Sequence, residues 1–203
     1  MTNPLYTVGH SNHPIEKFIE LLQLNGINAI GDVRSHPYSR HFPQFSQVAL
    51  KSYLNSNGIA YTFLGKEFGA RSDDASCYKN GRVQYDRLAA LPIFADGVKR
   101  ITEGMKRYKI ALMCAEKDPL SCHRALLVGR YFFWNGIPVE HIHADASLES
   151  HEHLESRLLK ACKLPEGDLF KSRADYLNEA YVIQGDRVAY QDESMNQQEA
   201  ILG

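Results

Sequence analysis

Short runs of apolar residues alternate along the chain with longer segments in which apolar residues recur at helical spacing. The apolar runs have the length of buried strands and fall at residues 5–8, 28–33, 59–64, 109–114 and 138–143. A polar loop follows each run, and strands and helices alternate throughout. This alternation predicts an α/β protein, a three-layer sandwich with a mainly parallel five-stranded sheet and helices on both faces.

The expected helices begin and end at residues that favour helix ends. Pro14 stands where a first helical residue belongs, and Asn25-Gly26 ends the same helix. Further helices are predicted at residues 46–55, 88–108, 122–135 and 150–162, the second of them interrupted or started near Pro92. Residues 65–82 predict a long irregular stretch rich in Gly, Asp and Arg, and such stretches are often functional.

The chain is expected to have two parts. Residues 1–165 carry the alternating pattern of the α/β domain, and residues 166–203 form a helical C-terminal extension. The polar end of the extension, from Asp192, is expected to fray. Tyr181 and Tyr190 are expected to be exposed aromatic residues that pack on the domain or on a second copy, and the sequence leaves the oligomeric state open.

Charge is distributed unevenly along these 203 residues. The formal net charge of -1 argues against a generally basic surface that coats nucleic acid, but it allows a local basic site. Residues 31–90 carry an excess of Lys and Arg, whereas residues 140–203 carry an excess of Asp and Glu. An anionic ligand therefore favours the first region, and the acidic end is expected to be a solvated helical surface.

The cysteines and the apolar runs indicate the cellular compartment of the protein. The four cysteines are irregularly spaced in a chain too long to need disulfides. The chain opens with a short polar segment rather than a signal peptide, and no apolar run approaches the roughly 20 residues of a membrane span. We therefore expect a cytoplasmic protein with reduced thiols and no membrane partner.

Polar residues of the kinds that perform chemistry follow every predicted strand. Because the strands are expected to be parallel, their carboxyl ends share one rim of the sheet, where ligands bind in folds of this class. We expect one shared site there. The alternative is that these residues are polar only because they lie in loops, which follow every strand and are exposed to solvent. The residues are His10 and Ser11, Asp32 and Arg34, Gly65 and Arg71, then Glu116, Cys122, His123 and Arg124, and finally His143.

Several of these residues belong to separate motifs that occur in a fixed order. The motifs are Thr7-Val8-Gly9-His10-Ser11, then Asp32-Val33-Arg34 with Pro37, Ser39 and Arg40, then Leu64-Gly65 with Glu67, Gly69 and Arg71, then Cys114-Ala115-Glu116-Lys117-Asp118-Pro119 ending in Cys122-His123-Arg124.

With these motifs the chain resembles the DUF488 family from about Leu5 to Ala144, so residues 1–165 resemble its domain. The tail motifs Ala180-Tyr181, Gln184 and Ala189-Tyr190 resemble those of its longer members. Ala70 stands where the family usually has a glycine, which affects only the shape of that loop. The family is one of unknown function, so the resemblance implies a fold and a set of residues but no reaction.

Cys122 and Glu116 are the candidates with the most specific chemistry. Cys122 stands at a predicted helix N-terminus beside His123, where a lowered pKa makes a thiol nucleophilic; the alternative is a small buried cysteine. Glu116 is a candidate general acid or base, with Asp32 either its partner or an ion pair that orders Arg34. The candidate catalytic residues are therefore Glu116, Asp32, His10, Cys122 and His123, and the candidate substrate-binding residues are Ser11, Arg34, Ser39, Arg40, Arg71 and Arg124.

Cofactor binding is not predicted by any motif in the sequence. His10, Cys114, Cys122 and His123 are ligand types that suit zinc or iron, but the spacing Cys-x7-Cys-His is no standard zinc signature. The Cys-Ala-Glu run is similar to the His-x-Glu of zinc deaminases, whose later Pro-Cys-x-x-Cys is absent. There is no Gly-x-Gly-x-x-Gly and no phosphate-loop motif, so a metal is an open but unfavoured alternative and the cofactor stays undetermined.

Two functions from different classes fit these residues. The first is an enzyme, a hydrolase or transferase that binds an anionic, nucleotide-like or nucleic-acid-derived substrate through arginines and moves protons through carboxylates. The second is a non-catalytic module that binds a nucleotide or nucleic acid through the same arginines. Aromatic and basic residues intermix at residues 37–45 and 78–87, which suits base stacking with phosphate contacts, although the same aromatic residues also suit a core. A redox protein using Cys114 and Cys122 is a weaker third function, since no Cys-x-x-Cys supports it.

Overall fold

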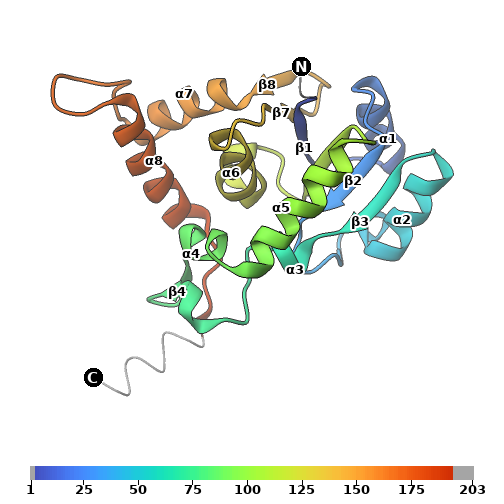
Figure 1. Ribbon diagram of the computed structural model, residues 1–203. Helices are drawn as coiled ribbons and strands as arrows, with labels where there is room; N and C mark the ends of the chain where they lie inside the picture. The colour runs from blue at the N-terminus through green and yellow to red at the C-terminus, as the bar shows by residue number, and fades with distance from the viewer. Residues whose placement is uncertain (1–2, 194–203) are drawn as a thin grey trace.

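A six-stranded sheet forms the centre of the protein, as seen in a computed structural model that describes residues 3–193 (Figure 1). The strand order is β3-β2-β6-β1-β7-β8, with five parallel strands and β8 antiparallel to β7. The predicted α/β class and mainly parallel sheet are confirmed. The strands are β1 Leu5–Gly9, β2 Ala29–Asp32, β3 Ala60–Phe63, β6 Ile110–Cys114, β7 Val139–Ile142 and β8 Leu148–Ser150.

All five predicted strands are present, and β8 is the additional sixth. It is three residues long, and Glu149 is the residue it buries. A strand this short and polar carries no apolar run, so the hydrophobic pattern alone does not indicate it.

Helices cover both faces of the sheet, because the side chains of each strand alternate between two cores. In β6, Ala111 and Met113 belong to the core under α1 (Ile15–Leu24) and α2 (Gln47–Ser56). Leu112 and Cys114 belong to the opposite core, which also holds Phe94 of α5 (Pro92–Met105). This second core continues into α7 (His151–Cys162) and α8 (Arg173–Val188) through residues such as Leu158 and Leu177.

The prediction that residues 65–82 are irregular is wrong in part. They contain α3 (Gly65–Phe68), a 3-10 turn at Ala75–Cys77, and the hairpin strand β4 (Tyr78–Lys79), with β5 (Arg82–Val83) as its partner. Asn80 and Gly81 connect the two strands with φ of 51° and 67°, as a tight hairpin turn requires. The elements are so short that only the Asn-Gly pair marks them in the sequence.

Two predicted helices are interrupted. The helix predicted at residues 88–108 consists of α4 (Tyr85–Ala89) and α5, because Pro92 disfavours helical backbone at Leu91. The helix predicted at residues 122–135 follows a 3-10 turn at Pro119–Ser121. It begins with a π-helical segment, η4 (Arg124–Gly129), and continues as α6 (Arg130–Trp134). Such π-helical turns are frequent at functional sites.

The C-terminal extension packs on the α/β domain. Tyr181 on α8 is buried with an exposed fraction of 3%, so the expectation that it is exposed is wrong. The backbone N–H of Val83 donates to the carbonyl of Tyr190, which places the end of the extension beside β5. The division at residue 165 stays a prediction, and of the polar end expected to fray from Asp192, residues 194–203 lie outside the described residues.

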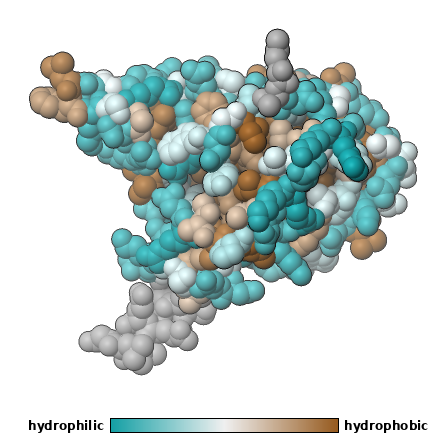
Figure 2. All heavy atoms as spheres, viewed as in Figure 1, coloured by the Kyte–Doolittle hydropathy of each residue, from teal (hydrophilic) through white to brown (hydrophobic). Residues whose placement is uncertain are grey.

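Leu169 and Phe170 are the most exposed apolar residues of the described chain and stand on the loop between α7 and α8. Figure 2 shows brown atoms at the tip of this loop, which projects from the body of the molecule in Figure 1. Among residues 3–193, no helix has the length and apolar character needed to cross a bilayer.

Candidate functional site

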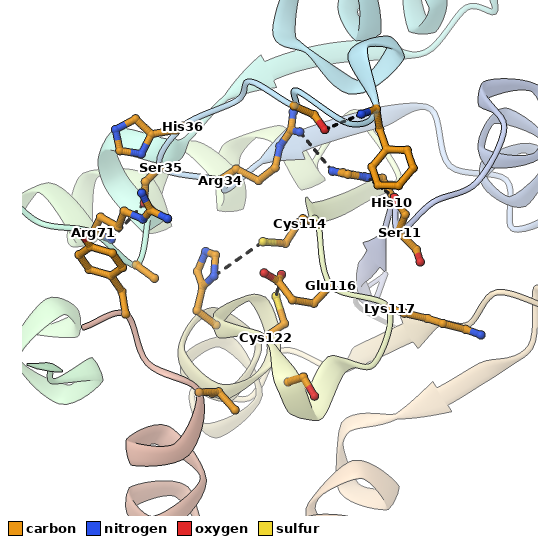
Figure 3. A pocket seen from close by; sticks show the side chains of 18 of the residues that line it. His10, Ser11, Arg34, Ser35, His36, Arg71, Cys114, Glu116, Lys117 and Cys122 are labelled. Carbon is orange, nitrogen blue, oxygen red and sulfur yellow. Dashed lines mark hydrogen bonds between the residues drawn. The ribbon is translucent and has the colours of Figure 1, made fainter. Parts of the chain in front are cut away.

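The candidate site lies where two neighbouring parallel strands send the chain to opposite faces of the sheet. β1 leads to α1 on one face, and β6 leads through η4 to α6 on the other. This divergence opens a crevice at the carboxyl ends of the strands, which is where ligands bind in open α/β sheets. A cavity of about 710 Å³ occupies the position and receives residues from the loops after β1, β2 and β6 (Figure 3).

The loops after β1 and β6 touch at Gly9. A Cβ atom at this position would lie 1.9 Å from the backbone oxygen of Glu116, so only glycine fits. The backbone N–H of His10 donates to the carbonyl of Cys114, and that of Ser11 donates to the carbonyl of Ala115. These contacts hold the two loops in one position relative to each other.

His10 and Arg34 form one wall of the cavity. Burial and the positive charge of Arg34 lower the pKa of His10 to about 4, so the imidazole is neutral at pH 7. Arg34 NH1 then donates to His10 Nε2 at 3.3 Å, and Nδ1–H donates to the carbonyl of Ser11 at 2.8 Å. The ring also stacks on Phe45 with centroids 4.2 Å apart. His10 is therefore held in one tautomer and one orientation.

Asp32 is fully buried and serves to hold Arg34. Its carboxylate accepts hydrogen bonds from Arg34 Nε at 2.9 Å and NH2 at 2.7 Å, and from the hydroxyl of Tyr61 at 2.9 Å. The backbone N–H of Arg34 adds a fourth bond at 3.2 Å. Asp32 does not line the cavity, so of the two roles expected for it the geometry matches the ion pair that orders Arg34.

Glu116 and Cys122 meet at the cavity wall. The Sγ atom of Cys122 lies 2.9 Å from Oε2 of Glu116. Glu116 is open to the cavity, yet the protein atoms around its carboxyl group desolvate it, and this burial together with Cys122 raises its pKa. Burial alone would raise the pKa of Cys122, but its hydrogen bond with Cys114 and the positive charge of Arg124 lower it well below the usual value. The two groups are therefore shifted in opposite directions, the carboxyl group toward its protonated form and the thiol toward its thiolate form.

Cys114 and His123 lie beside Cys122, next to its contact with Glu116. Nδ1 of His123 is 3.7 Å from Sγ of Cys114, and Nε2–H of His123 donates to the carbonyl of Val33 at 3.0 Å. The ligand atoms of Cys114, Cys122 and His123 all lie within 4.8 Å of one another, and all three residues are buried. Figure 3 shows Cys114, Glu116 and Cys122 pointing toward the same space.

Arg124 has no exposed surface and does not line the cavity. Its NH1 donates to the carbonyl of Glu116 at 2.7 Å and its NH2 to the carbonyl of Lys117 at 3.1 Å. The guanidinium group thus fixes the loop that carries Glu116. Arg124 is placed to shape the site rather than to contact a substrate.

The remaining expected substrate-binding residues divide into two groups. Ser11, Ser39 and Arg71 line the cavity, and Ser11 adopts a φ of 48°, which is uncommon for a residue with a side chain. Arg71 is exposed, and its guanidinium lies over the Tyr190 ring at 4.4 Å. Arg40 is exposed and does not line the cavity.

The structure brings further residues to the cavity that were not named as site residues from the sequence. Tyr85 belongs to the aromatic and basic run at residues 78–87, and Tyr190 belongs to a tail motif that carried no expected role in the site. Lys117 extends along the rim (Figure 3). Tyr38 and Phe42 belong to the aromatic and basic run at residues 37–45, which did indicate stacking residues. Their presence gives the cavity aromatic as well as basic walls.

The fold and the site define the chain as an α/β protein with a polar, cysteine-containing cavity at the switch point of its sheet. The family model described as "Domain of unknown function DUF488" matches residues 14–131. The chain belongs to this family, as its motifs indicated. The matched segment contains the loop from Cys114 to Arg124 and ends before α7 and α8. No curated protein and no solved structure matches the chain.

Proposed function

We propose that the protein is an enzyme that binds an anionic, nucleotide-like substrate in the cavity and uses Glu116 to transfer a proton. The observation that carries this proposal is the 2.9 Å contact between Glu116 Oε2 and Cys122 Sγ. Glu116 is the only carboxylate among the described residues that line the cavity. A desolvated carboxyl group open to a cavity is placed to act as a general acid or base in hydrolysis or transfer.

The walls of the cavity support a nucleotide-like substrate. Tyr38, Phe42, Tyr85 and Tyr190 offer aromatic faces on which a base stacks, and Arg71 is placed to meet a phosphate. A volume of about 710 Å³ suits a ligand of nucleotide size. The charge of Arg34 is already matched by Asp32, so the anion is expected to bind nearer to Arg71 and to Lys117 at the rim.

Substrate binding is tested by comparing two arginines. Binding of adenosine monophosphate and of a short single-stranded oligonucleotide is measured by calorimetry for the native chain, Arg71→Ala and Arg40→Ala. Arg71→Ala is expected to weaken binding by about tenfold, and increasing salt weakens the oligonucleotide further. Arg40→Ala is the matched control, because Arg40 is exposed and outside the cavity. Equal losses in both variants would contradict binding in this cavity.

The four cysteines are free thiols, which supports the proposal that the enzyme works in the reducing cytoplasm.

A further inference from the structure

We propose that Cys114, Cys122 and His123 bind one divalent metal ion, zinc by the nature of the donors, with a fourth position open to the cavity. The thiols of Cys114 and Cys122 would then be metal ligands, and the ion would supply the site with a Lewis acid. The existence of this metal site stands on its own geometry; only its use in catalysis rests on the proposed function.

The three donors are spaced as a tetrahedral ion requires. In a zinc site with sulfur and nitrogen ligands, bond lengths of about 2.3 and 2.05 Å place neighbouring ligand atoms roughly 3.6 Å apart. The Cys114 Sγ to His123 Nδ1 distance is 3.7 Å, and no two of the three ligand atoms lie more than 4.8 Å apart. The donors therefore surround one point without rearrangement of the backbone.

The groups around the donors hold them in the orientation that binding needs. His123 Nε2–H donates to the carbonyl of Val33 at 3.0 Å, which leaves Nδ1, the ring nitrogen that faces the thiols, as the atom that would bind a metal ion after losing any proton it carries. Metal-bound histidines almost always donate their second N–H in this way. The backbone N–H of Arg124 lies 3.4 Å from Cys122 Sγ, so it favours the thiolate form that coordinates.

The ligands come from segments that the fold holds in place. Cys114 is the last residue of β6, and Cys122 and His123 stand at the start of the helix formed by η4 and α6. The loop between them is fixed by Arg124, whose guanidinium donates to the carbonyls of Glu116 and Lys117. A site built on a strand end and a helix start is rigid enough to impose a geometry on the ion.

The cavity side of the cluster indicates a catalytic rather than a structural ion. Structural zinc sites have four protein ligands, whereas catalytic sites keep three and leave one position for water or substrate. Cys114, Cys122 and His123 all line the cavity, and Glu116 Oε2 stands 2.9 Å from Cys122 Sγ on that side. In such a site Glu116 would stand beside a metal ligand on the cavity side and would serve as the proton acceptor for the reacting group.

The test is metal analysis of the full-length protein by mass spectrometry. We expect about one zinc per chain in the native protein, less than roughly a tenth of that in Cys114→Ala and Cys122→Ala, and full occupancy in Cys162→Ser. Cys162 is the matched control, because it is a half-buried thiol outside the cluster. Cobalt(II) added to chelator-treated native protein should give thiolate charge-transfer bands and strong tetrahedral ligand-field bands, which tests the site even where a variant fails to fold.

Native protein that holds no metal and gives no cobalt bands, or that forms a Cys114–Cys122 disulfide instead, would overturn the proposal. Glu116→Gln separates this result from the proposed function, because the variant is expected to keep its metal. Full metal content without any turnover contradicts only the enzyme. Turnover that depends on Glu116 in a metal-free protein contradicts only the metal site.

Discussion

The guanidinium group of Arg34 holds the carboxylate of Asp32 through two hydrogen bonds, of 2.9 and 2.7 Å, beneath the candidate site. Both side chains are buried, at exposed fractions of 7% and 0%. A buried ion pair of this kind contributes to stability mainly through the cost of separating it, since either charge left alone loses its compensation. Arg34 in turn orients His10, so the pair supports one wall of the cavity.

Asp32→Ala is therefore expected to unfold the protein more easily. Removal of the carboxylate leaves Arg34 and the Tyr61 hydroxyl without their acceptor, and we expect a loss of about 3–5 kcal/mol in the free energy of unfolding. Denaturant titration measures it. Glu103→Ala is the control, because Glu103 pairs with Lys106 on the surface, where the loss is below about 1 kcal/mol. An equal, small effect in both variants would show that the buried pair is unimportant.

Gly9→Ala tests the contact between the loops after β1 and β6. The added methyl group would lie 1.9 Å from the backbone oxygen of Glu116, and backbone cannot move away as a side chain can. We expect destabilisation of at least about 2 kcal/mol, measured by thermal unfolding. Gly185→Ala is the opposite case: its nearest neighbours are Tyr85 ring carbons at 3.7 and 3.9 Å, and alanine is favoured within α8 by about 0.5–1 kcal/mol. Similar effects in both variants would contradict the close approach at Gly9.

His151 makes stability depend on pH. It lies in a buried chain of hydrogen bonds between His141 at 3.0 Å and the Tyr181 hydroxyl at 2.8 Å, which links the sheet to α8. Burial and the charge of Arg130 lower the pKa of His151 to about 3, below the 6.5 of the unfolded chain. Between these values the unfolded state binds a proton that the folded state does not, so stability falls as pH falls.

From pH 7 to pH 5 this difference at His151 amounts to about 2 kcal/mol. Unfolding in denaturant at several pH values measures the slope, which is expected to be shallower in His151→Gln. It should stay the same in His153→Ala, since His153 is an exposed residue of the same helix. A slope that persists unchanged in His151→Gln would assign the pH dependence to other groups.

The sequence predicts the parts of the fold that have their own local signal. The strands were recognisable because their apolar runs bury both faces of a parallel sheet, as in β6, where all five residues are buried. β8 and the hairpin at Asn80-Gly81 were not, because elements of two or three residues owe their conformation to neighbours distant in sequence. The same reason applies to Tyr181: it lies on the face of α8 that is buried, and the residues that cover it, Glu155 of α7 and Trp134 of α6, are distant in sequence.

The sequence predicts the location of the candidate site better than it predicts the role of each residue in it. Parallel strands imply a common rim, and the structure does bring His10, Arg34, Glu116 and Cys122 to one cavity. The direction of a side chain does not follow from its position in a motif. Arg124 points inward to backbone carbonyls, and the sequence carries no signal for that choice.

The central claim is that Glu116 performs chemistry on a bound nucleotide-like substrate. The most direct measurement incubates the native protein, Glu116→Gln and Glu103→Gln with a panel of nucleotides and short oligonucleotides. Products are followed by mass spectrometry, and binding is measured in parallel. The account predicts that Glu116→Gln binds its ligand as the native protein does but forms product at least about a hundredfold more slowly, while Glu103→Gln is unaffected. Ligand binding without product in the native protein, or product formation that is equal in Glu116→Gln, would contradict the account and favour a non-catalytic binding module.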